Sequence, residues 1–353
     1  MKNLKDNKCP GHDGIMNELL KASGEQMRKS IFNMMNRLFM HEEIPSALMN
    51  LDIKSIYKGK GLTADLKNHR GVFIGNVILK LYETMMDARS SPVIEEDGFT
   101  ENQAGGRRKR GIADHLFIIK AIIDHSTYFQ ILLILELLDL VKAFDKMRLK
   151  LVMNDLWKAG IRGRIWRNIY EVNKESRIFI KTPLGTTEGY NIGETVKQGS
   201  VLASKMASLH TDGVNRMFEN TGMGVQYGTV TINNLIFQDD IIKIENSEEK
   251  TNQSNRIYSW FAQINGMKFH ETKSEWISNS KKDLQINLDN KPLKRAEKAK
   301  YLGDILTPDG KIDETIAHRK SAVTGMMAEL STIMDEIGEC RIEATILPRH
   351  HHT

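Results

Sequence analysis

Cysteine is nearly absent from this chain of 353 residues. Cys9 and Cys340 are the only two, and they stand near opposite ends of the sequence. Such a pair offers neither a disulfide framework nor a Cys-x-x-Cys metal site. Since a chain without disulfides suits a reducing compartment, we expect an intracellular protein, nuclear or cytoplasmic, that is not secreted.

Long apolar runs are missing as well. The most apolar stretch, 131–138, is far shorter than the roughly 20 residues that cross a bilayer, and it contains Glu136. The opening residues, MKNLKDNKCPG, are polar and charged and lack the apolar core of a secretory signal. No repeat or low-complexity linker divides the chain. We therefore expect no membrane partner, and contiguous subdomains that share packed surfaces.

The charge of the chain is only mildly basic. Fifty Lys and Arg stand against 45 Asp and Glu, a formal charge of +5, which permits a nucleic-acid partner without requiring one. Five cations cluster around glycines in residues 53–72: Lys54, Lys58, Lys60, Lys67 and Arg70. This composition predicts a loop that is either close to phosphate or simply solvated.

The periodicity of apolar residues predicts helices and strands in alternation. Helices are expected at 18–40, 74–89, 142–158, 202–218, 247–263 and 313–334. Strands are expected at 131–139, 177–181, 189–196, 274–277 and 301–306, with a hairpin formed by 224–230 and 231–236. The pattern predicts an α+β fold.

Three aspartates stand at the ends of predicted strands. Asp139 closes an apolar run, and Asp239 and Asp240 follow the predicted hairpin and precede another apolar run. If the two strand regions are neighbours, the carboxylates could hold two divalent cations, because Mg²⁺ prefers oxygen ligands shared between carboxylates and substrate phosphates. Two such ions promote in-line phosphoryl displacement. The alternative is that Asp239 and Asp240 occupy an exposed turn, where aspartate is common.

The residues around these acids form three motifs in a recognisable order. They are LDLVKAFD at 138–145, VKQGSVL at 196–202 and FQDD at 237–240. Together they resemble the reverse transcriptase domain of non-LTR (LINE-type) retrotransposons. Further blocks that are similar to this family are CPGHDGI at 9–15, NHRGV at 68–72, QAGGR at 103–107, DHL at 114–116, GMKFHETKS at 266–274 and YLG at 301–303.

The resemblance implies a right-hand polymerase within the α+β class. Residues 1–126 would form helical fingers interleaved with the palm, 127–298 an antiparallel-sheet palm, and 299–353 a primer grip and partial helical thumb. The implied activity is RNA-directed DNA polymerisation. The implied partners are an RNA template, a DNA primer and dNTPs.

The resemblance also implies roles for single residues. Asp139, Asp239 and Asp240 would be the catalytic ligands of two Mg²⁺ ions, with Mn²⁺ as a substitute. Phe144 would exclude a 2′-hydroxyl because a bulky ring leaves no room for it. The remaining nucleotide-binding candidates are Arg107 and Arg70 for the triphosphate, Gln198 and Gly199 near the nascent base pair, and Lys273 near the departing pyrophosphate.

Six positions depart from the family pattern. They are His12 for Pro, His69 for Tyr, Gly106 for Phe, Ala203 for Ser, Ser204 for Pro and Gln238 for Ala. The long side chain of Gln238 could narrow the site beside the incoming sugar. The departures leave two alternatives open beside an active polymerase: an inactive copy that retains nucleic-acid binding, and an interaction scaffold that retains only the fold.

Overall fold

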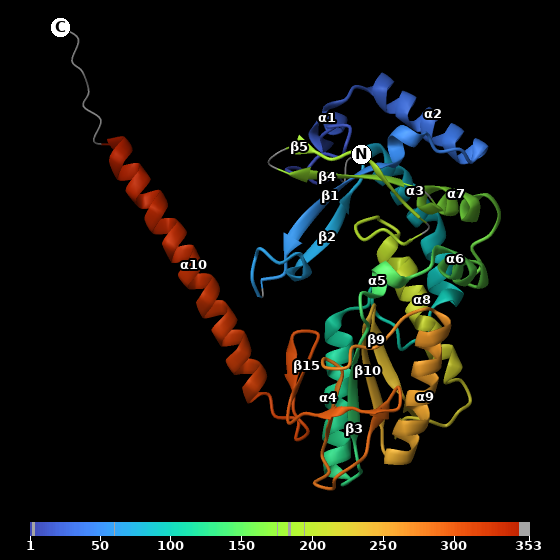
Figure 1. Cartoon of the computed structure of the whole chain (residues 1–353), viewed down its shortest axis with the longest axis vertical. Coiled ribbons are helices and arrows are strands. Elements are labelled where there is room, and N and C mark those ends of the chain that lie inside the picture. The colour runs from blue at the N-terminus through green and yellow to red at the C-terminus, as the bar shows by residue number, and fades with distance from the viewer. Residues whose placement is uncertain (2–3, 60, 175, 183–184, 194, 346–353) are drawn as a thin grey trace.

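Two five-stranded sheets, one above the other in Figure 1, organise the chain. The computed structural model describes residues 1, 4–59, 61–174, 176–182, 185–193 and 195–345, with backbone alone for 329 and 332–345. Lys60 of the basic segment lies outside the described residues. Helices and strands alternate along the chain, so the predicted α+β class is confirmed.

The upper sheet joins segments that are far apart in the sequence. Its order is β2-β1-β4-β5, with β6 also on β4, and the β1–β4 pair is parallel. The strands are β1 (Asn50–Tyr57), β2 (His69–Ile74), β4 (Ser176–Thr182), β5 (Gly185–Thr186) and β6 (Tyr190–Ile192). The prediction of a loop over 53–72 was therefore wrong at both ends, since β1 and β2 form an antiparallel hairpin around an irregular 58–68.

The lower sheet carries the three aspartates. Its order is β14-β11-β3-β10-β9, and β3 pairs antiparallel with β10. The strands are β3 (Ile134–Asp139), β9 (Asn234–Phe237), β10 (Asp240–Glu245), β11 (Glu275–Ser278) and β14 (Lys294–Arg295). One predicted hairpin proves to be two: a small one of β7 (Val225–Tyr227) with β8 (Val230–Ile232), then β9 with β10. Two further small hairpins are β12 (Asn287–Leu288) with β13 (Lys291–Pro292), and β15 (Ala299–Tyr301) with β16 (Asp304–Leu306).

Helices form at all six predicted places, two of which are divided, and two further long helices, at 112–128 and 163–174, were not predicted. They are α1 (Asn17–Ala22), α2 (Glu25–His41), α3 (Val77–Val93), α4 (Ile112–Tyr128), α5 (Ala143–Lys146), α6 (Leu149–Lys158), α7 (Gly163–Lys174), α8 (Ala203–Met217), α9 (Glu248–Ile264) and α10 (Asp313–Thr345). Three short helical turns span Ser46–Met49, Leu66–Asn68 and Ile94–Gly98. The helices predicted at 18–40 and 142–158 are each divided, because Ser23 and Gly24, and then Met147 and Arg148, take extended backbone angles.

Both faces of the lower sheet are buried, which explains the continuous apolar run of β3. Side chains alternate along a strand, so Leu138 and Ile241 join the main core with α8 and α9. Leu137 and Ile242 face the other way, into a second core with Ile119 and its neighbours on α4. Each such side chain contributes about 1.5 to 3 kcal/mol on burial. The sheet that carries the acids is thus held from two sides.

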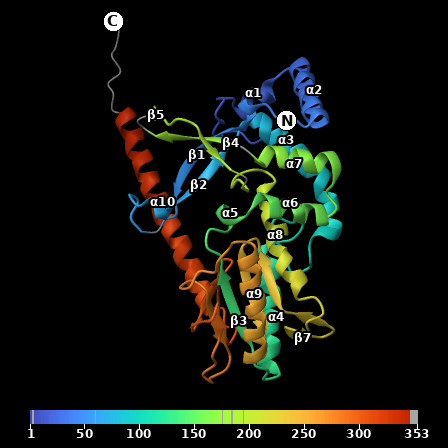
Figure 2. The same cartoon turned by 45° about the vertical axis from the view of Figure 1, so that its right-hand side comes forward.

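The last helix stands apart from the two sheets. In Figures 1 and 2, α10 leaves β16 and runs away from the rest of the chain. Among the described residues, no helix is both long and apolar enough to cross a membrane.

Candidate active site

Asp139 and Asp240 meet across the β3–β10 pair. The two residues are register partners, and antiparallel partners hold their Cα atoms about 4.5 to 5.5 Å apart with both side chains on one face. Asp239 stands in the turn between β9 and β10, after Gln238, whose φ of 61° lies in the left-handed region. The tight turn therefore places the second acid beside the first pair.

Desolvation and neighbouring negative charge raise the pKa of two of the three carboxylates, Asp239 and Asp240. Partial desolvation of the carboxylate, followed by the negative charges of Asp239 and Asp139, raises the pKa of Asp240 to about 6. Desolvation, together with the charge of Asp139, also raises the pKa of Asp239. The guanidinium of Arg70 opposes both shifts. The negatively charged carboxylates repel one another, and a bound cation would relieve this repulsion.

The donor set fits a hard divalent cation. It consists of carboxylate oxygens, which Mg²⁺ prefers, and the mutual repulsion of the acids supplies the attraction for positive charge. Within the described part of the chain, no group of three or more acidic, histidine or cysteine side chains is arranged so that it could hold a metal ion, and this includes the three aspartates. Mg²⁺ usually takes only one or two carboxylates and completes its shell with water and phosphate, so the register pair of Asp139 and Asp240 would be enough to begin a site.

A cationic side chain is already close to Asp139. Lys273 Nζ lies 3.5 Å from Asp139 Oδ2, and both side chains are well exposed, at 62% and 39%. Residues 268–274 run beside the end of β3, where the His270 amide donates to Asp139 O (2.8 Å) and Ser274 Oγ accepts from Asp139 N (3.1 Å). The structure therefore brings the predicted Lys273 to the predicted acids.

Gln198 and Gly199 lie against the inner end of β2. The Phe73 amide donates to Gln198 O at 3.0 Å. Gly199 has a φ of +111°, and a Cβ there would come within 2.6 Å of Phe73 O. Glycine is required for this close approach of the loop to the strand that carries Arg70.

The buried Glu83 of α3 holds that loop in place. Its carboxylate accepts from Ser200 Oγ at 2.7 Å and from the Val201 amide at 3.0 Å. Burial raises the pKa of Glu83, and the two donors oppose the shift. Sequence reasoning missed this residue, although an acid within the apolar face of a predicted helix was an available signal.

Phe144 is half-buried on α5 and packs against the main core. It follows Lys142, which has a φ of 49°, so the chain turns sharply between Asp139 and α5. One part of the ring thus packs against the core, and the other part is exposed near the end of β3.

Arg107 is placed differently from what the sequence predicted. Its side chain is 6% exposed, and its guanidinium pairs with Glu95 at 3.1 Å and donates to the carbonyls of Thr100 (2.8 Å) and Gln103 (3.2 Å). It also lies over the ring of Phe99. In this conformation Arg107 braces the segment before α4 and does not present a free guanidinium to a triphosphate.

Three of the departures from the family pattern lie in one place. Gln238 Nε2 donates to Ser204 Oγ at 2.5 Å. A Cβ at Gly106 would meet Ser204 O at 3.2 Å and Ser204 Oγ at 3.3 Å, and Gly106 has a φ of +69°. The side chain of Gln238 is therefore tied to α8. No sequence signal predicted that these three positions are neighbours.

A buried ion pair lies behind the acids, three residues along the same two strands. Lys243 and Glu136 are register partners, each 1% exposed, and their charged groups are in direct contact. Asn255 of α9 accepts from Lys243 and donates to Glu136 Oε1 at 2.7 Å. Burial lowers the pKa of Lys243, and Glu136 opposes this. The pair ties β3 to β10 in the register that sets Asp139 opposite Asp240.

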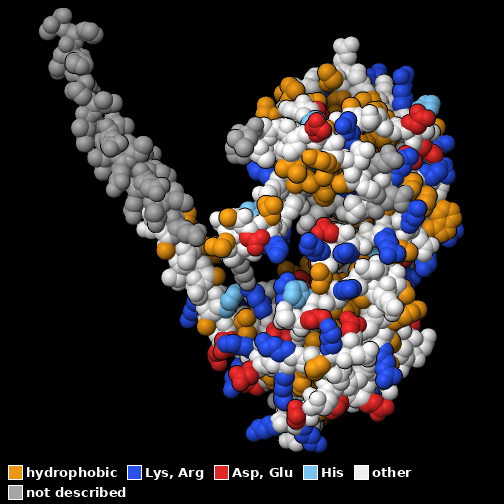
Figure 3. Space-filling view, in the orientation of Figure 1, with side chains coloured by type: hydrophobic (Ala, Val, Ile, Leu, Met, Phe, Trp, Pro, Cys, Tyr) orange, Lys and Arg blue, Asp and Glu red, His pale blue; other side chains and the backbone are white. Residues whose placement is uncertain are grey.

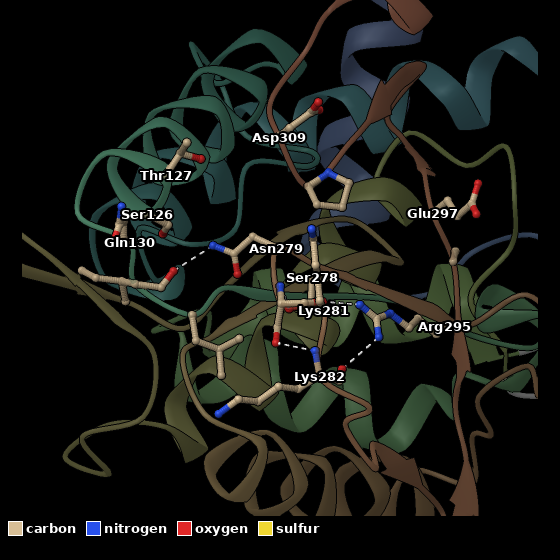
Figure 4. Close-up of a pocket in the computed structure, with 15 residues that line it drawn as sticks. Ser126, Thr127, Gln130, Ser278, Asn279, Lys281, Lys282, Arg295, Glu297 and Asp309 are labelled. Carbon is tan, nitrogen blue, oxygen red and sulfur yellow. Dashed lines mark hydrogen bonds between the residues drawn. The ribbon is translucent and has the colours of Figure 1, made fainter.

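The broad hollow drawn in Figure 4 lies at the far end of the lower sheet. It measures about 970 Å³ and is lined by the end of α4, residues 278–282, 295–297 and 308–309, and none of the three acids lines it. Arg295 points into this region, but its guanidinium is held by the carbonyls of Ser280 and Lys282. The hollow is thus separate from the acids.

Comparison with known proteins agrees with this geometry. The sequence model of the family described as reverse transcriptase (RNA-dependent DNA polymerase) matches residues 56–306. No curated protein matches the sequence. Among solved structures, apo telomerase from Candida tropicalis, truncated from its C-terminal domain, is similar with a TM-score of 0.52 at 13% identity, covering 80% of this chain and 59% of that one.

A second telomerase gives the same picture. The enzyme from Candida albicans, in complex with a TWJ fragment of telomeric RNA, has a TM-score of 0.52 at 10% identity and covers 82% of this chain and 50% of that one. The chain therefore spans between half and three-fifths of these telomerase chains. At such low identity the likeness concerns the fold.

Proposed function

Because the chain belongs to the reverse transcriptase family, we propose that it is an RNA-directed DNA polymerase domain of the non-LTR retrotransposon type. The observation that carries the proposal is the placement of Asp139 opposite Asp240, with Asp239 in the adjoining turn. The retrotransposon assignment rests on LDLVKAFD, VKQGSVL and FQDD in this order. The substrates would be a DNA primer, an RNA template and dNTPs.

The proposed subdomains follow the two sheets. Residues 1–126 form the fingers, 127–298 the palm on the lower sheet, and 299–353 the primer grip and partial thumb, of which 346–353 lie outside the described residues. Strands β4 to β6 of the middle segment pair with β1 of the first, which supports fingers that are interleaved with the palm.

In the proposed reaction the three aspartates hold the cations and the other candidates handle the nucleotide. Bound Mg²⁺, or Mn²⁺ in its place, would lower the pKa of the primer 3′-hydroxyl and stabilise the leaving oxygen. Arg70 neutralises the triphosphate, because its charge already reaches Asp239 and Asp240. Lys273 donates a proton to the departing pyrophosphate.

The remaining residues shape the nucleotide site. Phe144 faces the sugar and excludes a 2′-hydroxyl, while Gln198 and Gly199 border the nascent base pair. Arg107 supports the segment before α4 through Glu95. In this proposal Arg70, which is exposed, contacts the triphosphate in place of Arg107.

The departures from the family pattern fit the fold. Gln238 and Ser204 form a hydrogen bond beside Gly106. His69 contacts Ser55 Oγ at 2.8 Å and Thr63 O at 2.7 Å. His12 contacts Asp52 at 2.9 Å and stacks on Phe179. Polar groups in folded proteins are paired, and these polar side chains all have partners, so the changed positions keep the structure around the acids. Primer extension then separates an active enzyme from an inactive copy.

The test is extension of a labelled DNA primer on an RNA template with Mg²⁺ and dNTPs. We expect extension by the native chain and none by Asp239→Ala/Asp240→Ala. Asp283→Asn, an exposed aspartate on another loop, is the control and should extend normally. A folded native chain that binds primer and template in a salt-dependent way without extending the primer would support the inactive-copy alternative. Absence of both would support the scaffold.

A further inference from the structure

A row of aromatic rings, exposed at Trp157 and half-buried at Trp166 and Tyr170, runs along α6 and α7. Trp157, near the end of α6, stands edge-on to Trp166 with ring centroids 5.9 Å apart, and Trp166 is nearly parallel to Tyr170 at 6.0 Å. Arg162 lies 5.3 Å from the centre of the Trp157 ring, yet Trp157 remains 45% exposed. These four residues, with Lys158, are called the α6–α7 aromatic surface.

The rings are fixed before any partner arrives. Trp166 Nε1 donates to Met153 O at 2.8 Å, which holds the ring against α6. Trp166 and Tyr170 are half-buried and pack against the main core, which Ile169 and Val172 of the same helix join. A surface that is already ordered loses little side-chain entropy when it binds a ligand.

The same stretch concentrates positive charge. Residues 145–174 contain eight Lys and Arg and three Asp and Glu, a surplus of five that equals the formal charge of the whole chain. Two of the acids already have partners, since Asp155 bonds to His210 and Glu171 to Lys174. The rest of the chain is neutral on balance, so the surplus is local.

Nearby arginines outnumber the acids that face them. Arg164 and Arg167 share the single carboxylate of Glu42. Neither Lys158 nor Arg162 pairs with a carboxylate in the part of the chain that the structure describes. Figure 3 shows hydrophobic side chains among Lys and Arg along the right-hand edge, where α6 and α7 lie.

We propose that the α6–α7 aromatic surface binds single-stranded nucleic acid. Trp157 stacks on a base, Trp166 and Tyr170 extend the platform, and Lys158 and Arg162 contact phosphates. Aromatic platforms beside cations suit single strands, because every base has a face that can stack once it is unpaired. An acidic peptide would use the charge but not the rings, and a duplex would hide the base faces.

The surface is distinct from the proposed polymerase site. In both Figures 1 and 2, α6 and α7 lie on one side of the molecule and the β1–β2 hairpin on the other. The proposal therefore does not depend on catalysis by the three aspartates.

The experiment maps contacts of a short single-stranded RNA in which uridines are replaced by 4-thiouridine. After irradiation of the full chain with this RNA, we expect cross-linked peptides from residues 145–174. They should disappear in Trp157→Ala/Arg162→Ala and persist in Arg70→Ala, which removes a cation of the proposed polymerase site. Absence of cross-links in 145–174 at saturating RNA would overturn the proposal.

Competition against the cross-link identifies the class of partner. Unlabelled single-stranded RNA or DNA should abolish it, and a poly-glutamate peptide or duplex RNA should compete at least about tenfold less well, the loss expected when base stacking is unavailable. Equal competition by poly-glutamate would assign the surface to an acidic protein and overturn the proposal. The matched control is Trp260→Ala on α9, which removes a tryptophan that is 55% exposed and should leave the 145–174 cross-links unchanged.

Discussion

The two sheets differ in how they are held. The lower sheet is covered on both faces, and its central strands β3 and β10 are buried almost throughout. In the upper sheet, the last four residues of β1 are exposed, as is Arg70 on its partner β2. The acids therefore stand on a rigid base, while the cation opposite them stands on a sheet edge with little core. In the proposed site, the acids that would hold metal are therefore fixed, and Arg70, which would contact the nucleotide, is open to solvent.

The largest effect should come from the acids, and it should separate activity from stability. Asp240→Asn should lower primer extension at least about a thousandfold, because loss of a metal ligand removes several kcal/mol of transition-state stabilisation. The free protein should unfold at the same or a higher urea concentration, since one of three repelling charges is gone. Rates of extension and urea midpoints would be measured together. A variant that loses both activity and stability would mean that Asp240 acts in folding.

The buried pair behind the acids should matter most for stability. Lys243→Met leaves Glu136 buried and unpaired, and breaking such a pair costs about 3 kcal/mol of unfolding free energy or more. The double variant Lys243→Met/Glu136→Leu should recover most of the loss, because apolar pairs replace buried ion pairs well. Lys54→Met in the exposed part of the upper sheet should change stability by less than about 0.5 kcal/mol. Equal losses of unfolding free energy in Lys243→Met and Lys54→Met would mean that the two sheets do not differ in how strongly they are held.

The buried lower sheet could be predicted from the sequence better than the exposed upper sheet. The run that ends at Asp139 and the run that begins at Asp240 are apolar because both faces of the lower sheet are buried. The first was predicted as a strand, while the predicted hairpin was placed before Asp240, at 224–236. Strand β1 pairs in parallel with β4, more than a hundred residues later, and its exposed half mixes cations with apolar residues. Nothing local distinguishes such a strand from a basic loop.

Within the site, the sequence indicates positions but not contacts. Asp139 lies opposite Asp240, and its carboxylate is 3.5 Å from Lys273 Nζ. Arg107, in contrast, turns to Glu95, a carboxylate on a neighbouring turn. The Lys243–Glu136 pair was missed, although each is a lone charge within an apolar strand. Two opposite charges in adjacent apolar strands would have been a usable signal.

Acid should weaken the lower sheet through His115. This side chain is 2% exposed, its Nδ1 lies 3.2 Å from Tyr301 Oη, and its ring meets Phe237 just before the acidic turn. Burial lowers the pKa of His115 to about 4 from 6.5. Its contribution to stability is thus complete above pH 6.5 and is lost as the pH falls from there toward 4, by about 3 kcal/mol. In His115→Phe, the urea midpoint of unfolding should depend less on pH between 6.5 and 4 than in the native chain. An unchanged pH dependence would exclude His115 as the cause.

The smallest effect should come from the upper sheet and should appear in substrate binding alone. Arg70→Ala should raise the KM for dNTP about tenfold, the loss of roughly one charge-assisted contact. Because Arg70 is exposed on an edge strand, the unfolding free energy should stay within about 0.5 kcal/mol of the native value. The matched control is Lys67→Ala on the same hairpin, which should leave KM unchanged if charge near the acids matters more than the total charge of the loop. Equal KM changes in the two variants would mean that the hairpin acts only as a diffuse positive surface, and the division of the site between a fixed acidic sheet and one specific opposing cation would fail.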